Sequence, residues 1–573
     1  MRRLGEVFAV AAMVAALSAG NALAQSAQRS AVGQIPITQQ DLEGPATPQE
    51  EHLRRVSRAQ TIEALDENLF GYSINNYTGA LTFSVTDVSL PGNSDLVVAV
   101  ARRFDGNDVR SRGARVRSGH VFDDWDLDLP HLHGVFAGSV GWQAGPSSGI
   151  RCDQPNAGLA APPSVNGFDA DDYWHGNLLY VPGQGDDEIQ HLPSTQSDRP
   201  TDSATYRWVT KGLWFFSCLP ITANGVAGDA FLARDPQGNK YWFNHIVEKS
   251  YTPLTLSRGT GTVLPRRQIV ILPTRVEDRF GNWVTYTYDA VEARNLRVIE
   301  ASDGRRIDLS YATGPGNGPG GRISSVVVGS RTWTYGYSAS AGIGASLTSV
   351  TRPDGSRYVY DFSTFHEDRV DVTFESCGAP ARFVSNFQFV ATATHPSGAI
   401  GTFTFLFKQH GRGGVPQNCW TSSFSSGDRF PPVFTSLSLI RKEISGPNQL
   451  LPMVWQWTYP ELAWSYASQC PQNCPSTKLI EVTQPDSSVL RETYGVRYGE
   501  NDGLMLASEV WGRVDPSVIP PTPNVLLRRT DISHSYSPTG QAYLARVGTA
   551  VRLYQPVENR PFGCLKRTSR SAI

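Results

Sequence analysis

A strand-and-turn pattern that returns along much of the chain constrains its fold more than any other feature. β-Branched and aromatic residues alternate with polar residues at a period of two, and Gly, Asn-Gly or Asp-Gly interrupts the alternation about every ten residues. From Ala80 onward, Leu81, Phe83 and Val85 fall on one face of a strand and polar residues on the other. Residues 94–104 repeat the pattern after a Pro-Gly-Asn turn, so the two stretches predict a β-hairpin.

Units of this kind recur in the middle of the chain. The clear copies are DRFGNWVTYTYD from Asp278, ASDGRRIDLSY from Ala301 and RPDGSRYVYDF from Arg352, and looser copies begin at Ala233, Ala393 and Leu479. In the clear copies a Gly-containing turn separates an incoming strand from an outgoing strand that carries Tyr near its end. Gly suits such turns because a tight hairpin requires a positive φ. The units share a layout without an exact period, so they form a degenerate repeat.

One hairpin alone is marginal in water, because it exposes an apolar face and two unpaired edges. Hairpins that pair edge to edge would bury their aromatic rings against one another. The sequence therefore predicts an all-β protein, with an N-terminal β-rich region followed by β-hairpin repeats that form a spiralling sheet or partial shell. The regular placement of Trp283, Tyr286 and Tyr358 favours packing over a ligand-binding stripe.

The two ends of the chain differ from its middle. Arg2 and Arg3, an apolar run over residues 7–17 and the small-residue triplet ending at Ala24 have the order of a secretory signal peptide, residues 1–24. An uncleaved N-terminal anchor is the alternative. Residues 25–65 are predicted to be a flexible leader with a short helix over 49–65. We expect a β-rich domain over 66–220, the repeat region over 221–500 and an irregular C-terminal segment over 501–573.

Charge and motifs exclude several classes of function. The formal net charge is −2, and no basic run alternates with aromatic residues, so nucleic acid is not an expected partner. After the signal peptide no apolar run reaches the ~20 residues of a stable membrane span. The serine-hydrolase elbow, the phosphate loop, the His-Glu-x-x-His pair and the dinucleotide turn are all missing. We predict no cofactor and no enzymatic activity, although catalytic groups can converge from distant positions.

The chain has seven Cys, and in an oxidising compartment they predict disulfides rather than thiol chemistry. Sequence alone does not fix their connectivity. The pairs we expect, with Cys564 left over, are Cys152 with Cys218, Cys377 with Cys419, and Cys470 with Cys474. The last pair would suit half of a zinc site, but no second Cys or His pair stands at ligand spacing.

The most acidic segment is DDWDLDLPHLH, residues 123–133. If it is a strand, Asp124, Asp126 and Asp128 project from one face. Such a row suits a weak Ca²⁺ site, or an acid–base pair together with His131 or His133. A half-exposed strand with a solvated acidic face is the simpler interpretation, and we favour it.

A second cluster, FDADDYWHGN from Phe168, combines carboxylates with aromatic rings. Its candidate ligand-binding residues are Asp171, Asp172, Tyr173, Trp174 and His175. An aromatic face can stack on the apolar face of a sugar while the carboxylates accept its hydroxyl protons. The alternative, which we favour, is a turn whose aromatic residues plug the nearest sheet.

The repeat units resemble the YD-repeat, or RHS, family of secreted bacterial proteins. The resemblance rests on the Tyr-x-Tyr-Asp endings at 286–289 and 358–361, and on YSINNYTGALTFSVTDVSLPG from Tyr72 followed by Ala-Arg-Arg-Phe at 101–104. Clear repeats cover 233–362, with weaker copies to 498. The resemblance implies a large β-sheet that spirals into a hollow shell. In some members the shell encloses a C-terminal toxin, and others act at the cell surface in adhesion or contact between cells.

The chain departs from the fuller family pattern, since we find neither a segment that closes the shell near the C-terminus nor a distinct toxin domain. We therefore expect a secreted structural protein that forms part of a β-shell, with a role in cell-surface contact or toxin encapsulation. Its partners would be a carbohydrate or other cell-surface ligand, or a C-terminal toxin or shell partner encoded nearby. The alternatives are a carbohydrate-binding adhesin that uses Trp174, and a glycoside hydrolase that draws on two of Asp124, Asp126, Asp171 and Asp172 facing one cleft, roughly 5–9.5 Å apart.

Overall fold

The structure is a computed structural model in which two compact units are distinguished, Met1–Gly44 and Pro45–Ile573. All described residues belong to the second unit. The signal peptide, the leader and its helix lie outside them and stay predictions. The described residues are 69–106, 121–143, 149–155, 168, 170–174, 176–193, 199–255, 263–312, 321–338, 346–366, 371–373, 382–421, 426–428, 430–447, 450–470, 472–512, 514–515, 522–523, 525–536, 544–554 and 561–563.

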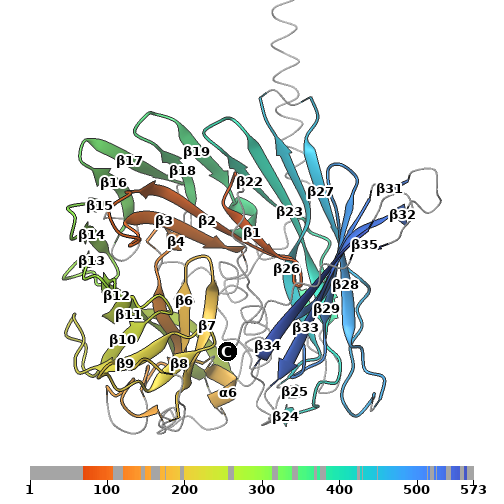
Figure 1. The fold of residues 1–573 in the computed structure, drawn as a ribbon, viewed down its shortest axis with the longest axis horizontal. Helices are drawn as coiled ribbons and strands as arrows, with labels where there is room; N and C mark the ends of the chain where they lie inside the picture. Colours follow the sequence, from red (N-terminus) through yellow and green to blue (C-terminus); the bar gives the residue numbers. More distant parts are fainter. Residues whose placement is uncertain are drawn as a thin grey trace, which may run out of the picture. The chain divides into compact units, whose positions relative to one another are not determined.

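Strands β5 to β12 form a closed antiparallel ring (Figure 1, from the orange β5 through the yellow strands to the yellow-green β12). Each strand pairs with the next, and β12 also pairs with β5. The pairing continues across residue 220, between β9 and β10, where the sequence suggested a domain boundary. The strands are β5 His131–Ala137, β6 Leu178–Val181, β7 Gly185–His191, β8 Trp208–Thr210, β9 Phe215–Leu219, β10 Ala230–Arg234, β11 Lys240–Thr255 and β12 Val263–Glu277.

Strand β12 belongs to the ring and also starts a second, open sheet. Its residues Arg266–Ile271 pair with β5, whereas Arg275–Glu277 pair with β13. Pro273 lies between these two stretches, opposite a register shift at Phe243 in β11. Proline has no N–H to give to a neighbouring strand, so it is tolerated at the point where the strand changes partner.

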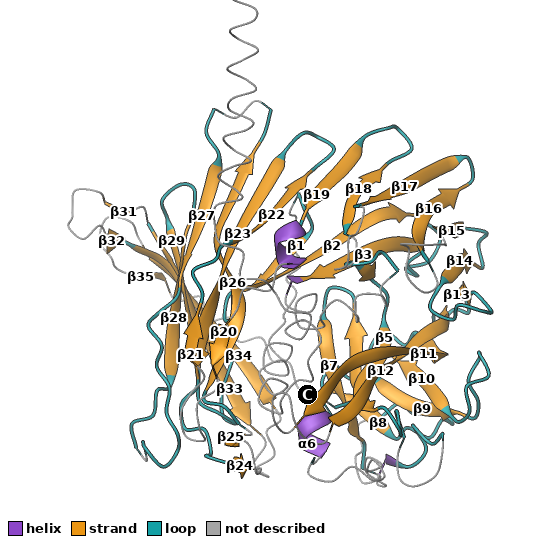
Figure 2. Ribbon diagram, turned by 180° about the vertical axis from the view of Figure 1, so that it is seen from behind, coloured by secondary structure: helices purple, strands orange, loops and turns teal. Residues whose placement is uncertain are grey.

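The open sheet continues from β12 through β35, and all its strand pairs are antiparallel (Figures 1 and 2). Its strands are β13 Trp283–Tyr288, β14 Leu296–Ala301, β15 Arg306–Ala312, β16 Arg322–Val328, β17 Arg331–Tyr337, β18 Leu347–Thr351, β19 Arg357–Asp361, β22 Phe389–Thr394, β23 Ile400–Gly411, β26 Val433–Ser445, β27 Met453–Thr458, β28 Thr477–Thr483, β29 Val489–Gly495, β30 Met505–Trp511, β33 Leu526–Tyr536, β34 Leu544–Tyr554 and β35 Pro561–Gly563.

Short hairpins and one helical turn interrupt this sheet, and a second helical turn lies between β5 and β6 of the ring. The hairpins pair β20 Asp371–Thr373 with β21 Arg382–Val384, β24 Cys419–Thr421 with β25 Ser426–Asp428, and β31 Val514–Asp515 with β32 Thr522–Pro523. The helical segments α6 Ala170–Tyr173 and η2 Ser363–His366 have four residues each. No described helix has the length and apolar content needed to cross a bilayer. The prediction of an all-β protein with a long continuous sheet is confirmed.

The six repeat units share one hairpin turn. In each, the N–H of the first turn residue donates to the carbonyl of the fifth, and the N–H of the fourth donates back to the carbonyl of the first. The fourth residue has a positive φ, 81° at Gly355 for example, which only glycine adopts without strain. The fourth residues of the six turns are Gly238, Gly281, Gly304, Gly355, Gly398 and Ser487. The degenerate repeat seen in the sequence is therefore a structural repeat.

Tyrosines near the ends of the outgoing strands add a second repeated contact. Their hydroxyls donate to a backbone carbonyl of an earlier strand, as Tyr311 does to Leu296 at 3.0 Å. In the β13, β15 and β17 strands the tyrosine stands at a register shift in the pairing with the following strand. We call these the tyrosine-to-carbonyl bonds. They join Tyr288 to Pro273, Tyr311 to Leu296, Tyr337 to Ile323 and Tyr459 to Leu439.

A separate four-stranded sheet, which we call the inner sheet, precedes the ring in the chain (Figure 1, red to orange strands). Its strands are β1 Tyr72–Asn75, β2 Ala80–Ser89, β3 Ala99–Asp105 and β4 Asp126–Leu127. The predicted hairpin is confirmed as the β2–β3 pair, with Leu81, Phe83 and Val85 all buried.

Candidate functional site

The inner sheet and the open sheet share one hydrophobic core. Phe83 and Phe104 of the inner sheet meet rings that belong to the open sheet or its connections. The ring centroids of Phe83 and Phe403 lie 5.1 Å apart, and those of Phe104 and Phe362 lie 4.8 Å apart. Trp125 has no exposed surface, and its ring centroid lies 5.1 Å from that of Tyr360. One face of the open sheet is therefore covered by the chain's own inner sheet.

A buried ion pair anchors this contact. Arg102 in β3 and Asp87 in β2 are 2.9 Å apart, and neither side chain is exposed. Arg102 also donates to the Tyr360 hydroxyl at 2.8 Å, and the Tyr335 hydroxyl donates to Asp87 at 2.9 Å. Burial opposes the charge of the guanidinium, but the nearby Asp87 and Tyr360 raise the pKa of Arg102. Both tyrosines belong to the repeats, so the sheets are joined by charge as well as by packing.

The turn between β1 and β2 inserts into the C-terminal half of the open sheet. The Tyr77 hydroxyl donates to Asp502 at 2.5 Å, and the Lys478 ammonium lies 3.4 Å from the Tyr77 ring centroid. Lys478 also lies 3.2 Å from Nδ1 of His410. Burial lowers the pKa of both Lys478 and His410 well below their ordinary values, and in His410 the Lys478 charge acts in the same direction. The guanidinium of Arg412 lies 3.7 Å from the Asp502 carboxylate and belongs to the same group of charged residues.

The predicted acidic row is not one face of a strand. Only Asp126 belongs to β4, and Asp124 lies in a turn that pairs Phe122 with Trp125 and so buries both rings. The three carboxylates take different partners: Asp124 accepts from the Leu347 N–H, Asp126 pairs with Lys249, and Asp128 accepts from the hydroxyls of Ser84 and Tyr180. In the described part of the chain no group of His, Cys, Asp and Glu is placed to hold a metal ion.

Asp124, Asp126 and His131 line a small cavity of about 90 Å³ whose wall is both polar and apolar. Burial, aided by the nearby His133, lowers the pKa of His131 to about 3. His131 Nδ1 lies 2.8 Å from the Leu129 carbonyl, and Nε2 of His133 lies 2.9 Å from Asp186. Ligand pockets usually measure ~300–1,000 Å³. A sugar ring would not fit this cavity, so it does not favour a glycoside hydrolase.

The cluster around Trp174 packs inward. Tyr173 is 2% exposed and belongs to a hydrophobic cluster with Phe168 and Leu264, against which Trp174 also packs. Asp172 is likewise buried, the side chain of Asp171 is not described, and His175 lies outside the described residues. The buried Tyr173 ring offers no face to a sugar, so the geometry gives no support to a carbohydrate ligand here.

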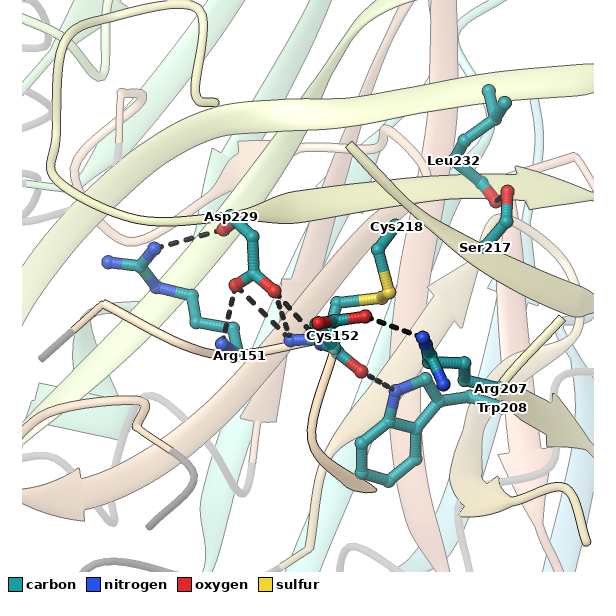
Figure 3. Close-up of a disulfide and its surroundings, with 9 residues drawn as sticks. Arg151, Cys152, Arg207, Trp208, Ser217, Cys218, Asp229 and Leu232 are labelled. Atoms are coloured by element: carbon teal, nitrogen blue, oxygen red, sulfur yellow. Dashed lines mark hydrogen bonds and ion pairs between the residues drawn. A yellow bond between two sulfur atoms is a disulfide. The ribbon is translucent and has the colours of Figure 1, made fainter. Parts of the chain in front are cut away.

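Two of the expected disulfides are present. Cys152 pairs with Cys218 (Figure 3), and Cys470 pairs with Cys474. Around the first, the Asp229 carboxylate accepts from backbone N–H groups of residues 151–153, and the Trp208 indole donates to the Cys152 carbonyl at 2.8 Å. Cys377 lies outside the described residues and the Cys419 side chain is not described, so their pairing stays a prediction.

Sequence reasoning missed the buried charges. Lys478 and Asp502 stand in no motif, and the sequence segments that contain Asp87 and Arg102 do not mark these residues as buried charges. The tyrosines that bond to Arg102, Asp87 and Asp502 lie 258, 248 and 425 residues away from them in the chain. The one available signal was that Arg102 follows Val100 and precedes Phe104 in the alternation, which places it on the buried face of its strand.

These features define a class: an all-β protein in which hairpin repeats extend one antiparallel sheet outward from a closed ring. No protein-family model matches the chain, and no curated protein matches it significantly. The chain is similar to the crystal structure of TcdB2-TccC3-TEV, with 11% identity and a TM-score of 0.27 over 89% of this chain and 27% of that one. For TcdB2-TccC3-Cdc42 the values are 10%, 0.25, 84% and 26%. The chain thus spans about a quarter of the length of both.

Proposed function

We propose that this chain is an exported YD-repeat structural protein whose open sheet is the wall of a β-shell that encloses a polypeptide cargo such as a toxin. The observation that carries the proposal is the shared turn of the six repeat units, with glycine in the fourth position of five. Each hairpin leaves one edge for the next to pair with, so such a wall grows by addition. The tyrosine-to-carbonyl bonds tie strands together along the same wall.

Export agrees with the disulfides, because such bonds persist in oxidising compartments. The test is N-terminal sequencing of the protein recovered from the culture medium or the cell surface. Cleavage after Ala24 is the expected result. A chain that keeps Met1 and stays in the cytoplasm would contradict export.

Enclosure is tested with a flexible, trypsin-sensitive reporter peptide appended after Ile573. A shell wall excludes the protease, so the appended reporter is expected to be cut much more slowly than the free peptide. The matched control inserts the same reporter between Leu450 and Leu451, which are 101% and 81% exposed beside β27. That reporter should be cut at the rate of the free peptide. Equal cleavage at both positions would reject enclosure and leave a role in surface contact as the remaining part of the prediction.

A further inference from the structure

A second cavity, much larger than the one at His131, lies where the inner sheet, the ring and the open sheet meet. Its volume is about 480 Å³, within the ~300–1,000 Å³ of ligand sites. Protein interiors are close-packed, and voids of this size are not part of ordinary packing. Ala99 comes from the inner sheet, Val181 and Tyr241 from the ring, and Tyr286 from the open sheet. The cavity therefore exists only because three sheets are assembled around it.

The buried charge on its wall is negative and has no counter-ion. Asp128 is 7% exposed and accepts only from the neutral hydroxyls of Ser84, at 2.5 Å, and Tyr180, at 2.6 Å. Among the described residues no Lys, Arg or His forms an ion pair with it, and none lines the cavity. Buried carboxylates are normally paired with a cation. A carboxylate has about four acceptor positions, so two hydroxyl donors leave room for another donor.

A second polar group on the wall is unused. Tyr286 is 8% exposed, and its hydroxyl makes no hydrogen bond within the part of the chain that the structure describes. Burial alone raises the pKa of Tyr286 to about 12, so the hydroxyl is neutral. A polar group bound in the cavity could use this hydroxyl as a hydrogen-bond donor or acceptor.

The rest of the wall is mostly apolar, with Leu96, Leu129, Val276 and Val284 buried around it. The loop between β2 and β3 forms an open side, where Val97 is 69% exposed and Asp95 is exposed as well. An acidic, partly apolar opening admits a cation with an apolar body and disfavours an anion. We propose that this cavity binds a compact organic amine, whose protonated nitrogen pairs with Asp128 and whose apolar body fills the space between the three sheets.

The experiment compares three compounds with one apolar body, titrated calorimetrically into the full exported chain: 4-phenylbutylamine, 4-phenylbutanol and 4-phenylbutyrate. The amine is expected to bind about tenfold more tightly than the alcohol, which is the scale of one charge-assisted hydrogen bond. The butyrate should show no binding. Equal affinity for amine and butyrate, or no binding of any compound, would overturn the proposal.

Variants of the cavity residues test whether the amine pairs with Asp128. Asp128→Asn should lower the affinity for the amine to that for the alcohol. The control is Asp126→Asn, because the Asp126 carboxylate pairs with Lys249 outside this cavity, and it should leave the affinities for both compounds unchanged. If Asp128→Asn does not fold, Ala99→Phe, which fills the cavity from β3, should abolish binding of both compounds. Unchanged amine binding in Ala99→Phe, or equal effects of the two Asp variants, would place the amine elsewhere and sink the proposal. The amine site does not depend on cargo enclosure. The protease test measures cleavage of a reporter and the calorimetry measures amine binding, so the failure of one proposal can be told apart from the failure of the other.

Discussion

Arg102 and Asp87 form an ion pair without solvent contact, in which Nε of the guanidinium lies 2.9 Å from the carboxylate where the inner sheet meets the open sheet. Two repeat tyrosines complete it, since Tyr360 accepts from the guanidinium and Tyr335 donates to the carboxylate. The N-terminal sheet is thus attached to the repeats through residues that belong to the repeats themselves.

Removing one partner should be far more damaging than removing both. Arg102→Met leaves a buried carboxylate uncompensated and should reduce the free energy of unfolding by about 3–5 kcal/mol. The double variant Arg102→Met with Asp87→Leu leaves no buried charge and should recover most of that loss. Urea unfolding of the wild type, Arg102→Met, Asp87→Leu and the double variant measures these losses. A double variant whose destabilisation equals the sum of the two single variants would contradict coupling between these charges.

The exceptional repeat turn offers a stabilising substitution. Ser487 occupies the position held by glycine in the other five turns and has a φ of 67°. Ser487→Gly should raise the free energy of unfolding by about 0.5–1 kcal/mol, because glycine meets no steric penalty there. The reciprocal change Gly355→Ser should lower it by a similar amount, since no neighbouring atom lies within 4 Å of an added Cβ and only the backbone penalty remains. Opposite signs in the denaturant midpoints would show that the turn does not require this conformation.

The tyrosine-to-carbonyl bonds should each contribute modestly. Tyr311→Phe removes a hydroxyl that donates to Leu296 at 3.0 Å, and should cost about 1 kcal/mol. The matched control is Tyr286→Phe, on the adjoining hairpin, whose hydroxyl has no hydrogen bond among the described residues. It should change stability little. Equal losses in the two variants would show that the hydroxyl bond of Tyr311 adds nothing beyond ring packing.

Local features of this fold could be predicted from the sequence, whereas its long-range closures could not. The six turns and the β2–β3 hairpin depend on neighbouring residues, and alternation with glycine is sufficient to find them. The pairing of β12 with β5 joins residues 266–271 to residues 132–137, and no local pattern indicates that the ring closes there. The acidic row shows the same limit, since Asp124, Asp126 and Asp128 take partners from three other segments.

The buried pair of His410 and Lys478 should make the protein sensitive to acid. Burial, with the Lys478 charge, keeps the pKa of His410 well below its ordinary 6.5, so the folded protein leaves this imidazole neutral while the unfolded chain protonates it. Below pH 6.5 the unfolded state therefore binds more protons, and stability falls as the pH is lowered, by up to about 1.4 kcal/mol per pH unit from this group. Burial also lowers the pKa of Lys478, 3.2 Å from this imidazole, so Lys478 adds a pH dependence of the same sign, which a His410 variant keeps.

His410→Gln should flatten that dependence between pH 8 and pH 5, even if the amide lowers stability at both ends. The measurement is the urea midpoint of the wild type and the variant at each pH, with His191→Gln as the control because the His191 side chain is exposed on β7. The control should lose stability with acid as steeply as the wild type does. A His410 variant that is as acid-sensitive as the wild type would show that protonation of this histidine on unfolding does not cause the loss of stability in acid.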